Sequence, residues 1–555
     1  MRVKVRGKDG AKRRGDARNN KSVSQKEGLT MKKMILLGLS AAMLAFLPMQ
    51  EGHAKTLKWS FQGDVATLDP YAHAESFTGN FLHHIYEPLV RRGRDLSFEP
   101  ALASGWELVE PTVWRFKLRE GVKFHDGKSF DADDVVASLD RIRHPDARQK
   151  GYAQAIKDVR KVDQFTVDIE TKGAYPLLLN DLSGIFMMSH AWLKEHNAEQ
   201  PVSITTGQTT FASSNTNGTG PFKLESYRAD QKAVMTVNTE WWDTPEHNLT
   251  RIEFTPIKAD ATRIAALLSG EVDLVLPASL QDIQRINSAS GFKVLELPSV
   301  RTIFFGFNIQ ADELNNSDVK GKNPLSDPKV RKALWMGIDS EQLTGRIMRG
   351  KARTAGVIAA PEMPGYSPEL DVRPPYDPEA AKALLAEAGY PDGFSTNLSC
   401  SNDRYVNDEP ICVAVTAMWA RIGVTANLTT ESKTTYFPKI DRGEADIFMF
   451  GYAALPAMDG FSILTAQLSA RKDGRGQNNF GGYDNPAIEE IVAKAAVEQD
   501  NTKRLALITE ALRISNEEVA YLPLHQQPIA WAVRDGIDVP QFADEYLRLW
   551  FAKVD

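Results

Sequence analysis

The chain has 555 residues, with 66 Lys and Arg against 72 Asp and Glu and a formal net charge of −6. An acidic balance argues against nucleic acid or an anionic membrane surface as the main partner. The part of the chain that follows residue 54 is 501 residues long, too long for a single hydrophobic core, so two or more lobes are expected.

Residues 31–54 have the pattern of a secretory signal peptide. Two Lys precede an apolar run over 34–47, and Gly52 and Ala54 supply the small residues that a signal peptidase needs. The run is too short for a comfortable membrane span, although a buried helix or a membrane anchor is the alternative. No Cys lies near the cleavage site, so no lipid anchor is expected. The sequence therefore predicts export with cleavage after Ala54.

The 30 residues before Met31 are rich in Arg, Lys, Gly and Ser and show no apolar periodicity. We interpret residues 1–30 as a non-native or disordered extension, with translation starting at Met31. Residues 1–54 hold 12 basic and 4 acidic side chains, so the chain that remains after cleavage would carry a net charge of −14.

Beyond the leader, short apolar strands alternate with amphipathic helices, which predicts an α/β architecture. Residues 114–119 alternate apolar side chains with Arg and Lys, as a half-buried strand does. Asp131, followed by acidic residues, predicts the N-cap and first turn of a helix that runs to about Ile142. A second capped helix is predicted over 377–388 and ends at Gly389.

One arrangement occurs twice, at residues 263–276 and 437–450. Each copy has a helical segment, a Gly, the pattern Glu-x-Asp and an apolar strand. The repetition predicts two lobes built on similar units, with chance similarity as the alternative. Between the copies, Thr302–Asn308 is expected to be a buried strand that passes from one lobe to the other and forms a hinge.

The chain lacks the sequence patterns of common catalytic sites, since GxSxG, HExxH and a GxGxxG after a strand are all absent. Binding is therefore favoured over catalysis, and no catalytic residue, metal site or cofactor is predicted. His83 and His84 are adjacent and would suit a metal, but a polar helix edge is the commoner arrangement. Cys400 and Cys412 could form a disulfide in an oxidising compartment or remain two buried thiols.

Five blocks stand out along the chain: TLDPY at 67–71, the long block 101–141, GTGPF at 218–222, 326–339 and 376–394. Together they resemble the dipeptide/oligopeptide-binding family of solute-binding proteins that serve ABC importers, and they follow the order of that family from about residue 57 to 530. Their strand and turn residues are mostly scaffold, so we assign no ligand contacts to them.

The resemblance implies a bilobed periplasmic-binding-protein fold with a cleft between the lobes and an extra subdomain inserted in the first lobe. Lobe 1 is expected at 55–305 and 522–555, with the insertion at about 87–214, and lobe 2 at 306–521. Closure of the lobes would trap a ligand away from water, where each ligand charge needs an opposite charge or several hydrogen bonds.

The resemblance also implies candidate ligand contacts. In dipeptide-binding members an Arg holds the ligand carboxylate and an Asp its amine, and the Arg position corresponds to Arg404. The family pattern GWxxD aligns with residues 451–455, so Tyr452 stands in place of Trp and Leu455 in place of the Asp. Asp459 is the candidate substitute for that Asp. The predicted ligand-binding residues are Arg404, Tyr452 and Asp459, and a free ligand amine is in doubt because of Leu455.

The expected function is the periplasmic substrate-binding component of an ABC importer that captures peptides or peptide-like amino-acid conjugates. Its expected partners are the ligand, permease subunits and cytoplasmic ATPases, and a monomer is expected. The same scaffold could instead bind a sugar, a nickel chelate or haem, and a secreted hydrolase is a third interpretation.

Overall fold

The computed structural model describes residues 55–73, 75–203, 207–455, 457–472 and 474–555. The predicted extension at 1–30 and the predicted signal peptide at 31–54 lie outside the described residues. Within those described ranges, no helix combines the length and apolar character needed to cross a membrane.

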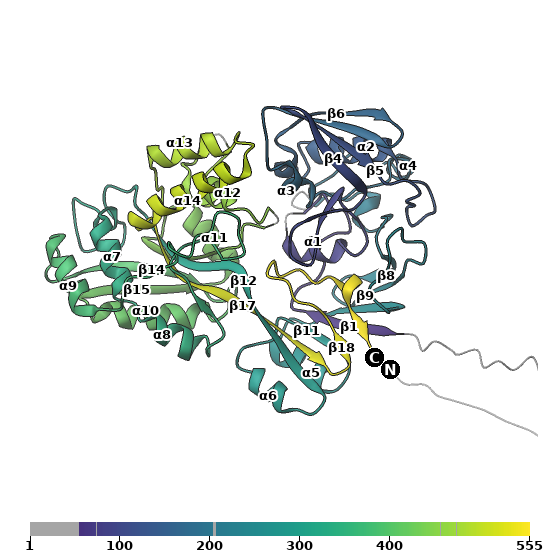
Figure 1. Ribbon diagram of the computed structural model, residues 1–555. Helices are drawn as coiled ribbons and strands as arrows, with labels where there is room; N and C mark the ends of the chain where they lie inside the picture. Colours follow the sequence, from purple (N-terminus) through teal and green to yellow (C-terminus); the bar gives the residue numbers. More distant parts are fainter. Residues whose placement is uncertain (1–54, 74, 204–206, 456, 473) are drawn as a thin grey trace, which may run out of the picture. The chain divides into compact units, whose positions relative to one another are not determined.

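In the part of the chain that the structure describes, the strands form one large sheet and three smaller ones (Figure 1). The order in the large sheet is β15 (Val424–Glu431), β14 (Phe394–Ser401), β16 (Ile447–Tyr452), β12 (Phe292–Phe307), β17 (Tyr521–Arg534), β11 (Leu274–Leu276), β1 (Thr56–Phe61), β10 (Arg251–Pro256), β9 (Lys232–Val237) and β8 (Phe222–Arg228), with β13 (Arg353–Thr354) beside β17. The smaller sheets are β4 (Ala103–Glu110), β5 (Val113–Leu118), β7 (Thr166–Thr171) and β6 (Ile156–Asp163); β2 (Val90–Arg92) with β3 (Phe98–Pro100); and β18 (Ile537–Asp538) with β19 (Lys553–Val554).

Helices pack around these sheets and are, in chain order, α1 (Ser76–Leu82), α2 (Ala132–Arg143), α3 (Leu178–Leu182), α4 (His190–Glu195), α5 (Asp260–Leu268), α6 (Ile283–Ser288), α7 (Pro328–Met336), α8 (Ser340–Gln342), α9 (Pro378–Glu387), α10 (Asp408–Ala420), α11 (Lys433–Asp441), α12 (Gly460–Ile463), α13 (Pro486–Ala495) and α14 (Asn501–Glu517). Strands and helices alternate through most of the chain, so the predicted α/β class is confirmed.

Two long strands are shared by both lobes of the fold. β12 and β17 pair antiparallel from Phe292 opposite Arg534 to Gly306 opposite Tyr521, with a register shift between Pro298 and Thr302. One end of this pair continues into β16 and β14, which belong to the second lobe with α7–α14. The other end continues into β11 and β1, which belong to the first lobe (Figure 1).

The predicted strand at Thr302–Asn308 is therefore real and longer than expected, while its role as a hinge stays a prediction. The lobe boundaries at 305/306 and 521/522 also stay predictions; they fall within the second half of β12 and at the start of β17.

We call residues 90–198, which contain β2–β7 and α2–α4, the inserted subdomain.

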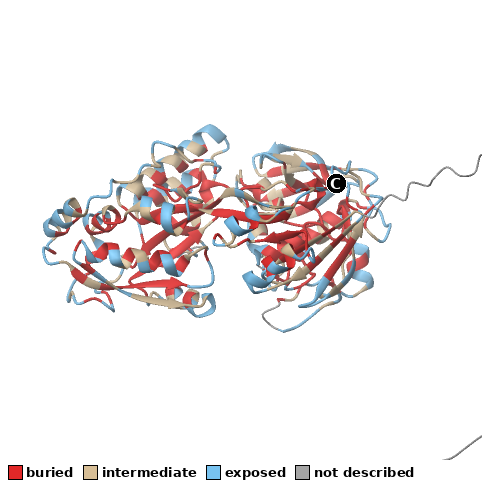
Figure 2. Cartoon of the chain, turned by 90° about the horizontal axis from the view of Figure 1, so that it is seen from below, coloured by how far each residue is buried: buried red, intermediate tan, exposed pale blue. Residues whose placement is uncertain are grey.

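Each lobe has its own buried interior (Figure 2). The first lobe packs around fully buried rings such as Trp59, Phe116 and Phe254. In the second lobe the sheet separates two apolar layers, because Phe305 packs on one side and its neighbour Phe304 on the other. This alternation is the two-residue period of a strand that is buried on both faces.

The two predicted capped helices form where their cap residues place them. The Asp131 side chain accepts from the backbone N–H of Asp133, and Asp134 completes a capping box at the start of α2. α9 begins at Pro378 after the N-cap Asp377, and Gly389 beyond its end has φ +90°. Both predictions are confirmed, because the cap residues satisfy backbone groups that the helix leaves unpaired.

The predicted repeat is structural. In the first copy Asp273 precedes β11 and its carboxylate accepts from Lys58 N on β1, at 2.9 Å. In the second copy Asp446 precedes β16 and accepts from Asn397 N on β14, at 3.1 Å. In both copies the strand runs parallel to the neighbour it is tied to, so each lobe holds the same unit.

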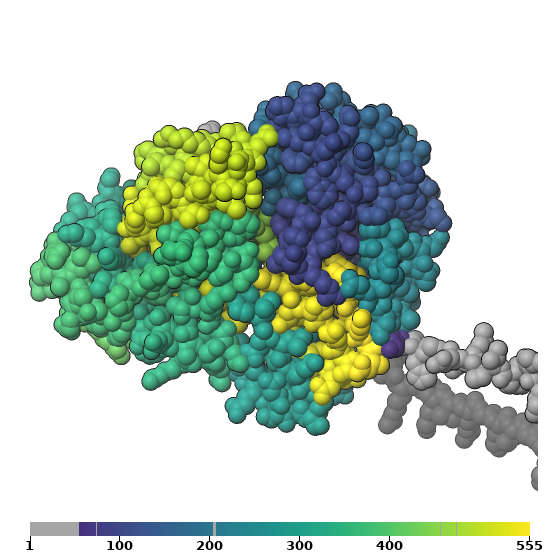
Figure 3. All heavy atoms as spheres, viewed as in Figure 1, coloured from purple at the N-terminus to yellow at the C-terminus, as the bar shows by residue number. Residues whose placement is uncertain are grey.

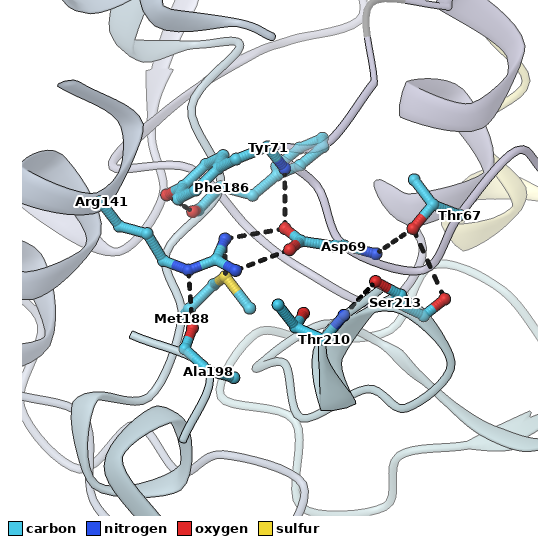
Figure 4. Close-up of polar contacts among 9 residues, drawn as sticks. All are labelled: Thr67, Asp69, Tyr71, Arg141, Phe186, Met188, Ala198, Thr210 and Ser213. Carbon is cyan, nitrogen blue, oxygen red and sulfur yellow. Dashed lines mark hydrogen bonds and ion pairs between the residues drawn. The ribbon is translucent and has the colours of Figure 1, made fainter. Parts of the chain in front are cut away.

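The TLDPY block is a scaffold element (Figure 4). Arg141 on α2 donates to both carboxylate oxygens of Asp69 at 2.7 and 2.6 Å, and both side chains are buried. Asp69 also accepts from Tyr71 N. The block therefore ties the start of the first lobe to the inserted subdomain, in agreement with the scaffold role expected of it.

Candidate ligand-binding cleft

A cavity of about 580 Å³ lies where the inserted subdomain meets the second lobe. Its first wall comes from β2, β3, β4, β5 and the segment around α3, and carries Phe98, Trp114 and Tyr175. Its second wall comes from the start of α14 and the residues before α12. In Figure 3 the yellow-green helices of the second lobe meet the dark blue inserted subdomain along this side of the molecule.

Asp459 lines this cavity, and its carboxylate is engaged by Arg504. The guanidinium of Arg504 on α14 donates to both oxygens, at 3.0 and 2.6 Å, and both side chains are buried. Asp459 is also the N-cap of α12 and accepts from Phe461 N at 2.9 Å. It therefore offers no free carboxylate for a ligand amine, and its predicted ligand contact stays a prediction.

The two lobes touch through hydrogen bonds beside the cavity. Arg92 and Asn180 of the inserted subdomain both donate to the carbonyl oxygen of Ala457 in the second lobe, each at 2.5 Å. Gln499 donates to the carbonyl oxygen of Pro111, in the turn between β4 and β5, at 3.2 Å. The structure thus has the lobes in contact along this side of the cleft.

Arg92 is a cation surrounded by neutral acceptors. Its guanidinium donates to the carbonyl oxygens of Leu96 and Ala457 and lies 4.2 Å from the centre of the Phe98 ring, and its buried Nε has no hydrogen-bond partner among the described residues. Burial lowers the pKa of Arg92 from its ordinary value to about 10. A guanidinium in such a place gains from a negatively charged neighbour.

Arg404 lies in the loop between β14 and α10, at the carboxyl end of a strand that runs parallel to β16. Ligands of open α/β sheets bind at this edge. The loop is held by Asp408, whose carboxylate accepts from the backbone N–H groups of Arg404 and Tyr405 at 3.1 Å. Arg404 therefore extends from a loop with a fixed backbone.

The Arg404 guanidinium has neither a hydrogen bond nor an ion pair among the described side chains, and lies 5.1 Å from the centre of the Tyr405 ring. The residue is exposed, yet desolvation by the surrounding protein lowers its pKa, and the positive charge of Arg301 lowers it further. Arg301 itself is paired with Glu545, at 3.2 Å. A cation that is accessible, yet has lost part of its hydration to the surrounding protein, is typical of a side chain in a recess.

Tyr452 ends β16 at the same edge of the sheet, as the parallel pairing of β14 and β16 requires. Tyr405 packs against Gly451, the residue before Tyr452, where an added Cβ would lie 2.6 Å from the Tyr405 ring. The structure thus brings the Arg404 loop and the end of β16 together. The Tyr452 hydroxyl donates to the carbonyl oxygen of Ser462, at 3.4 Å.

The three predicted site residues do not share one cavity. Asp459 lines the 580 Å³ cavity, and Arg404 and Tyr452 do not. Sequence reasoning missed the cavity residues Arg92 and Arg504, because they belong to strand and helix patterns with no distinctive spacing. The available signal was the position of Arg92 at the end of a short strand, β2.

Two other sequence interpretations have clear outcomes. Cys400 and Cys412 form a disulfide that joins the end of β14 to α10, so the alternative of two free thiols is wrong. His83 and His84 are buried at the end of α1, so the expectation of a polar helix edge is also wrong. Among the described residues, no group of three or more His, Cys, Asp or Glu is placed to hold a metal ion.

The shared strands, the two equivalent units and the cleft define a bilobed binding protein of the periplasmic type. The chain belongs to the bacterial extracellular solute-binding proteins of family 5, whose family pattern matches residues 97–474. The predicted family and fold are thereby confirmed.

Its relatives differ in what they are named for. The chain is 26% identical over 545 residues to the dipeptide-binding protein of Escherichia coli, a match that covers 92% of this chain and 96% of that protein. It is 28% identical over 472 residues to heme-binding protein A of Haemophilus influenzae, covering 79% and 81%. The solved structure of HbpA2 from Haemophilus parasuis has a TM-score of 0.77 and 23% identity, covers 90% of this chain and 100% of that chain, and shows the same fold.

Proposed function

We propose that this protein captures peptides or peptide-like amino-acid conjugates outside the cytoplasm and delivers them to an ABC importer. The observation that carries the proposal is Arg404, an accessible guanidinium without a carboxylate partner among the described residues, at the carboxyl edge of β14. A ligand carboxylate would supply the missing counter-charge, and Arg forms such pairs with two parallel hydrogen bonds. Tyr452, at the same edge, would pack beside the bound ligand.

Export to the periplasm belongs to the proposal. Residues 31–54 would direct secretion and be removed, and the released protein would begin at Lys55. The intact mass of the protein recovered from a periplasmic extract tests this point. A mass that retains the leader would contradict cleavage.

The proposed partners are two permease subunits and cytoplasmic ATPases, with the binding protein acting as a monomer and without catalysis of its own. The large acidic excess of the chain after residue 54 fits a freely diffusing carrier better than a nucleic-acid or membrane binder.

A thermal-shift screen combined with native mass spectrometry tests the binding function. Purified protein is offered peptides, sugars, nickel chelates and haem, and a ligand that binds only the folded protein raises the melting temperature. A shift with peptides or amino-acid conjugates supports the proposal. Chemical turnover of a solute without stabilisation would favour the hydrolase instead.

Haem is the second candidate, because the chain is as similar to a heme-binding relative as to a dipeptide-binding one. The aromatic wall of Phe98, Trp114 and Tyr175 would suit a flat, apolar ligand. Titration of the protein with haem, followed by absorption spectroscopy, separates this candidate from the first. Saturable haem binding with no response to peptides would replace the proposed ligand class.

A further inference from the structure

We propose that the 580 Å³ cavity receives a part of the ligand that is apolar or aromatic and negatively charged, and that a ligand ammonium is excluded from it. This inference rests on the proposed function and narrows its ligand class to conjugates or peptides whose amine is blocked. It follows from the charges that line the cavity and from the partners those charges already have.

The carboxylate that lines the cavity is already paired. Asp459 is the carboxylate among the described lining residues, and Arg504 and the N–H of Phe461 occupy its oxygens. Two further acids do not line the cavity: Asp544 is bound by both terminal nitrogens of Arg548, and Asp181 accepts from the Tyr175 hydroxyl at 2.8 Å. A bound ammonium would find no free counter-charge among the described lining residues.

The basic groups are not neutralised to the same degree. Arg92 donates to two carbonyl oxygens and forms no ion pair among the described residues, and the two acids that act on its pKa, Asp459 and Asp544, are paired with other Arg side chains. A partly buried charge without a hydrogen-bonded counter-ion is costly. An anionic ligand group would remove that cost, whereas a cationic group would add repulsion.

The remaining surface of the cavity suits an apolar group. Phe98 and Trp114 on one side face Leu505 and Met458 on the other. The volume falls in the range of about 300–1,000 Å³ that is typical of small-molecule sites. A ligand with a hydrophobic body and a negative end would match both the walls and Arg92.

Glu75 is the alternative counter-charge that a ligand ammonium could use. Its carboxylate is exposed and lies within electrostatic reach of Arg404. Both of its oxygens accept hydrogen bonds from the first turn of α1, from Phe77 N and Thr78 N. If Glu75 nevertheless held a ligand ammonium, free peptides would bind at least as well as blocked ones, so the experiment compares these two classes directly.

The test uses two peptide libraries that differ in one group. Peptides of about two to four residues, enough to fill a cavity of this size, carry aromatic and aliphatic side chains and are prepared with free N-termini and with N-acetyl groups. Both libraries are offered together to the leaderless protein. Native mass spectrometry identifies what binds, and calorimetry measures the strongest matched pair. We expect the acetylated member to bind about tenfold or more tightly.

Equal affinity, or tighter binding of the free peptide, would overturn the inference and leave the proposed function intact. Binding of neither library would overturn the inference, and the thermal-shift screen then decides the proposed function separately. Arg92→Gln should abolish the preference for the acetylated member, and Arg92→Lys, which keeps the charge, should retain most of it. The matched control is Arg94→Gln, since Arg94 is exposed, pairs with Glu246 at 2.7 Å and does not line the cavity. A preference that survives Arg92→Gln would also contradict the inference.

Discussion

Arg504 on α14 donates to both carboxylate oxygens of Asp459, the N-cap of α12, although the two residues are 45 positions apart. The pair fixes the second wall of the cavity. It also supports the loop before α12, which faces the inserted subdomain.

Asp459→Asn should destabilise the second lobe, because it leaves the buried Arg504 without its counter-charge. The expected loss in free energy of unfolding is about 3–5 kcal/mol. Urea denaturation measures it. The double variant Asp459→Leu with Arg504→Met should recover a large part of the loss, since it removes both charges, and failure of any recovery would show that helix capping rather than the ion pair dominates.

Arg404→Ala should weaken binding of a carboxylate-bearing ligand by roughly 2–5 kcal/mol, because the ligand charge would lose its paired cation. Calorimetry with the ligand from the screen measures the change, and an unaltered melting temperature of the free protein shows that the fold is intact. The matched control is Arg421→Ala, which removes an exposed Arg at the far end of α10 from this loop. Unchanged affinity in Arg404→Ala would remove this residue from the site.

Replacement of both Cys400 and Cys412 by Ser should lower the free energy of unfolding by about 3 kcal/mol, the value for a loop of this length. The bond closes a segment with a sequence separation of 12 and holds the Arg404 loop between β14 and α10. Ligand affinity should fall as well, because the loop loses its support. Reduction of the wild-type protein with dithiothreitol should give the same two changes, and no effect of either treatment would contradict the proposed support.

Glu87 should make stability depend on pH. Its buried carboxyl accepts from Trp241 Nε1, Trp242 Nε1 and Thr219 Oγ1. Burial raises the pKa of Glu87 from 4.5 to about 7, against the lowering effect of those hydrogen bonds.

Because the folded pKa of Glu87 lies above the unfolded value, the folded state binds more protons between these two values. The free energy of unfolding should therefore fall as pH rises through this window, by on the order of 3 kcal/mol at most. Urea titrations near about pH 5 and about pH 8 test this. Glu87→Gln should reduce the dependence, and Glu107→Gln, on the exposed part of β4, should not. An equal slope in both variants would exclude Glu87 as the cause.

Local features could be predicted from the sequence wherever one short segment contains the whole cause. The caps of α2 and α9, the alternation along β5 and the Glu-x-Asp unit all depend on neighbouring residues, and the structure contains each of them. The order of the two lobes along the chain was predicted from the family resemblance.

The site could be predicted only in part. Arg404 and Tyr452 follow strands, and the parallel pairing of β14 and β16 explains why they share an edge. The cavity residues Arg92, Trp114 and Arg504 come from three distant segments, and nothing in a single segment records which surfaces will face each other. The pairing of Asp459 with Arg504 could not be predicted for the same reason.

The long pairing of β12 with β17 has a consequence for the covalent chain. The polypeptide leaves the first lobe through one of these strands and returns through the other, and the two are hydrogen-bonded to each other along nearly their whole length. A protein cut once in the segment 310–327 would thus consist of two fragments that share a sheet. We expect such fragments to co-purify and to reassemble when expressed separately, so the fold is suited to split-protein reporters of ligand capture.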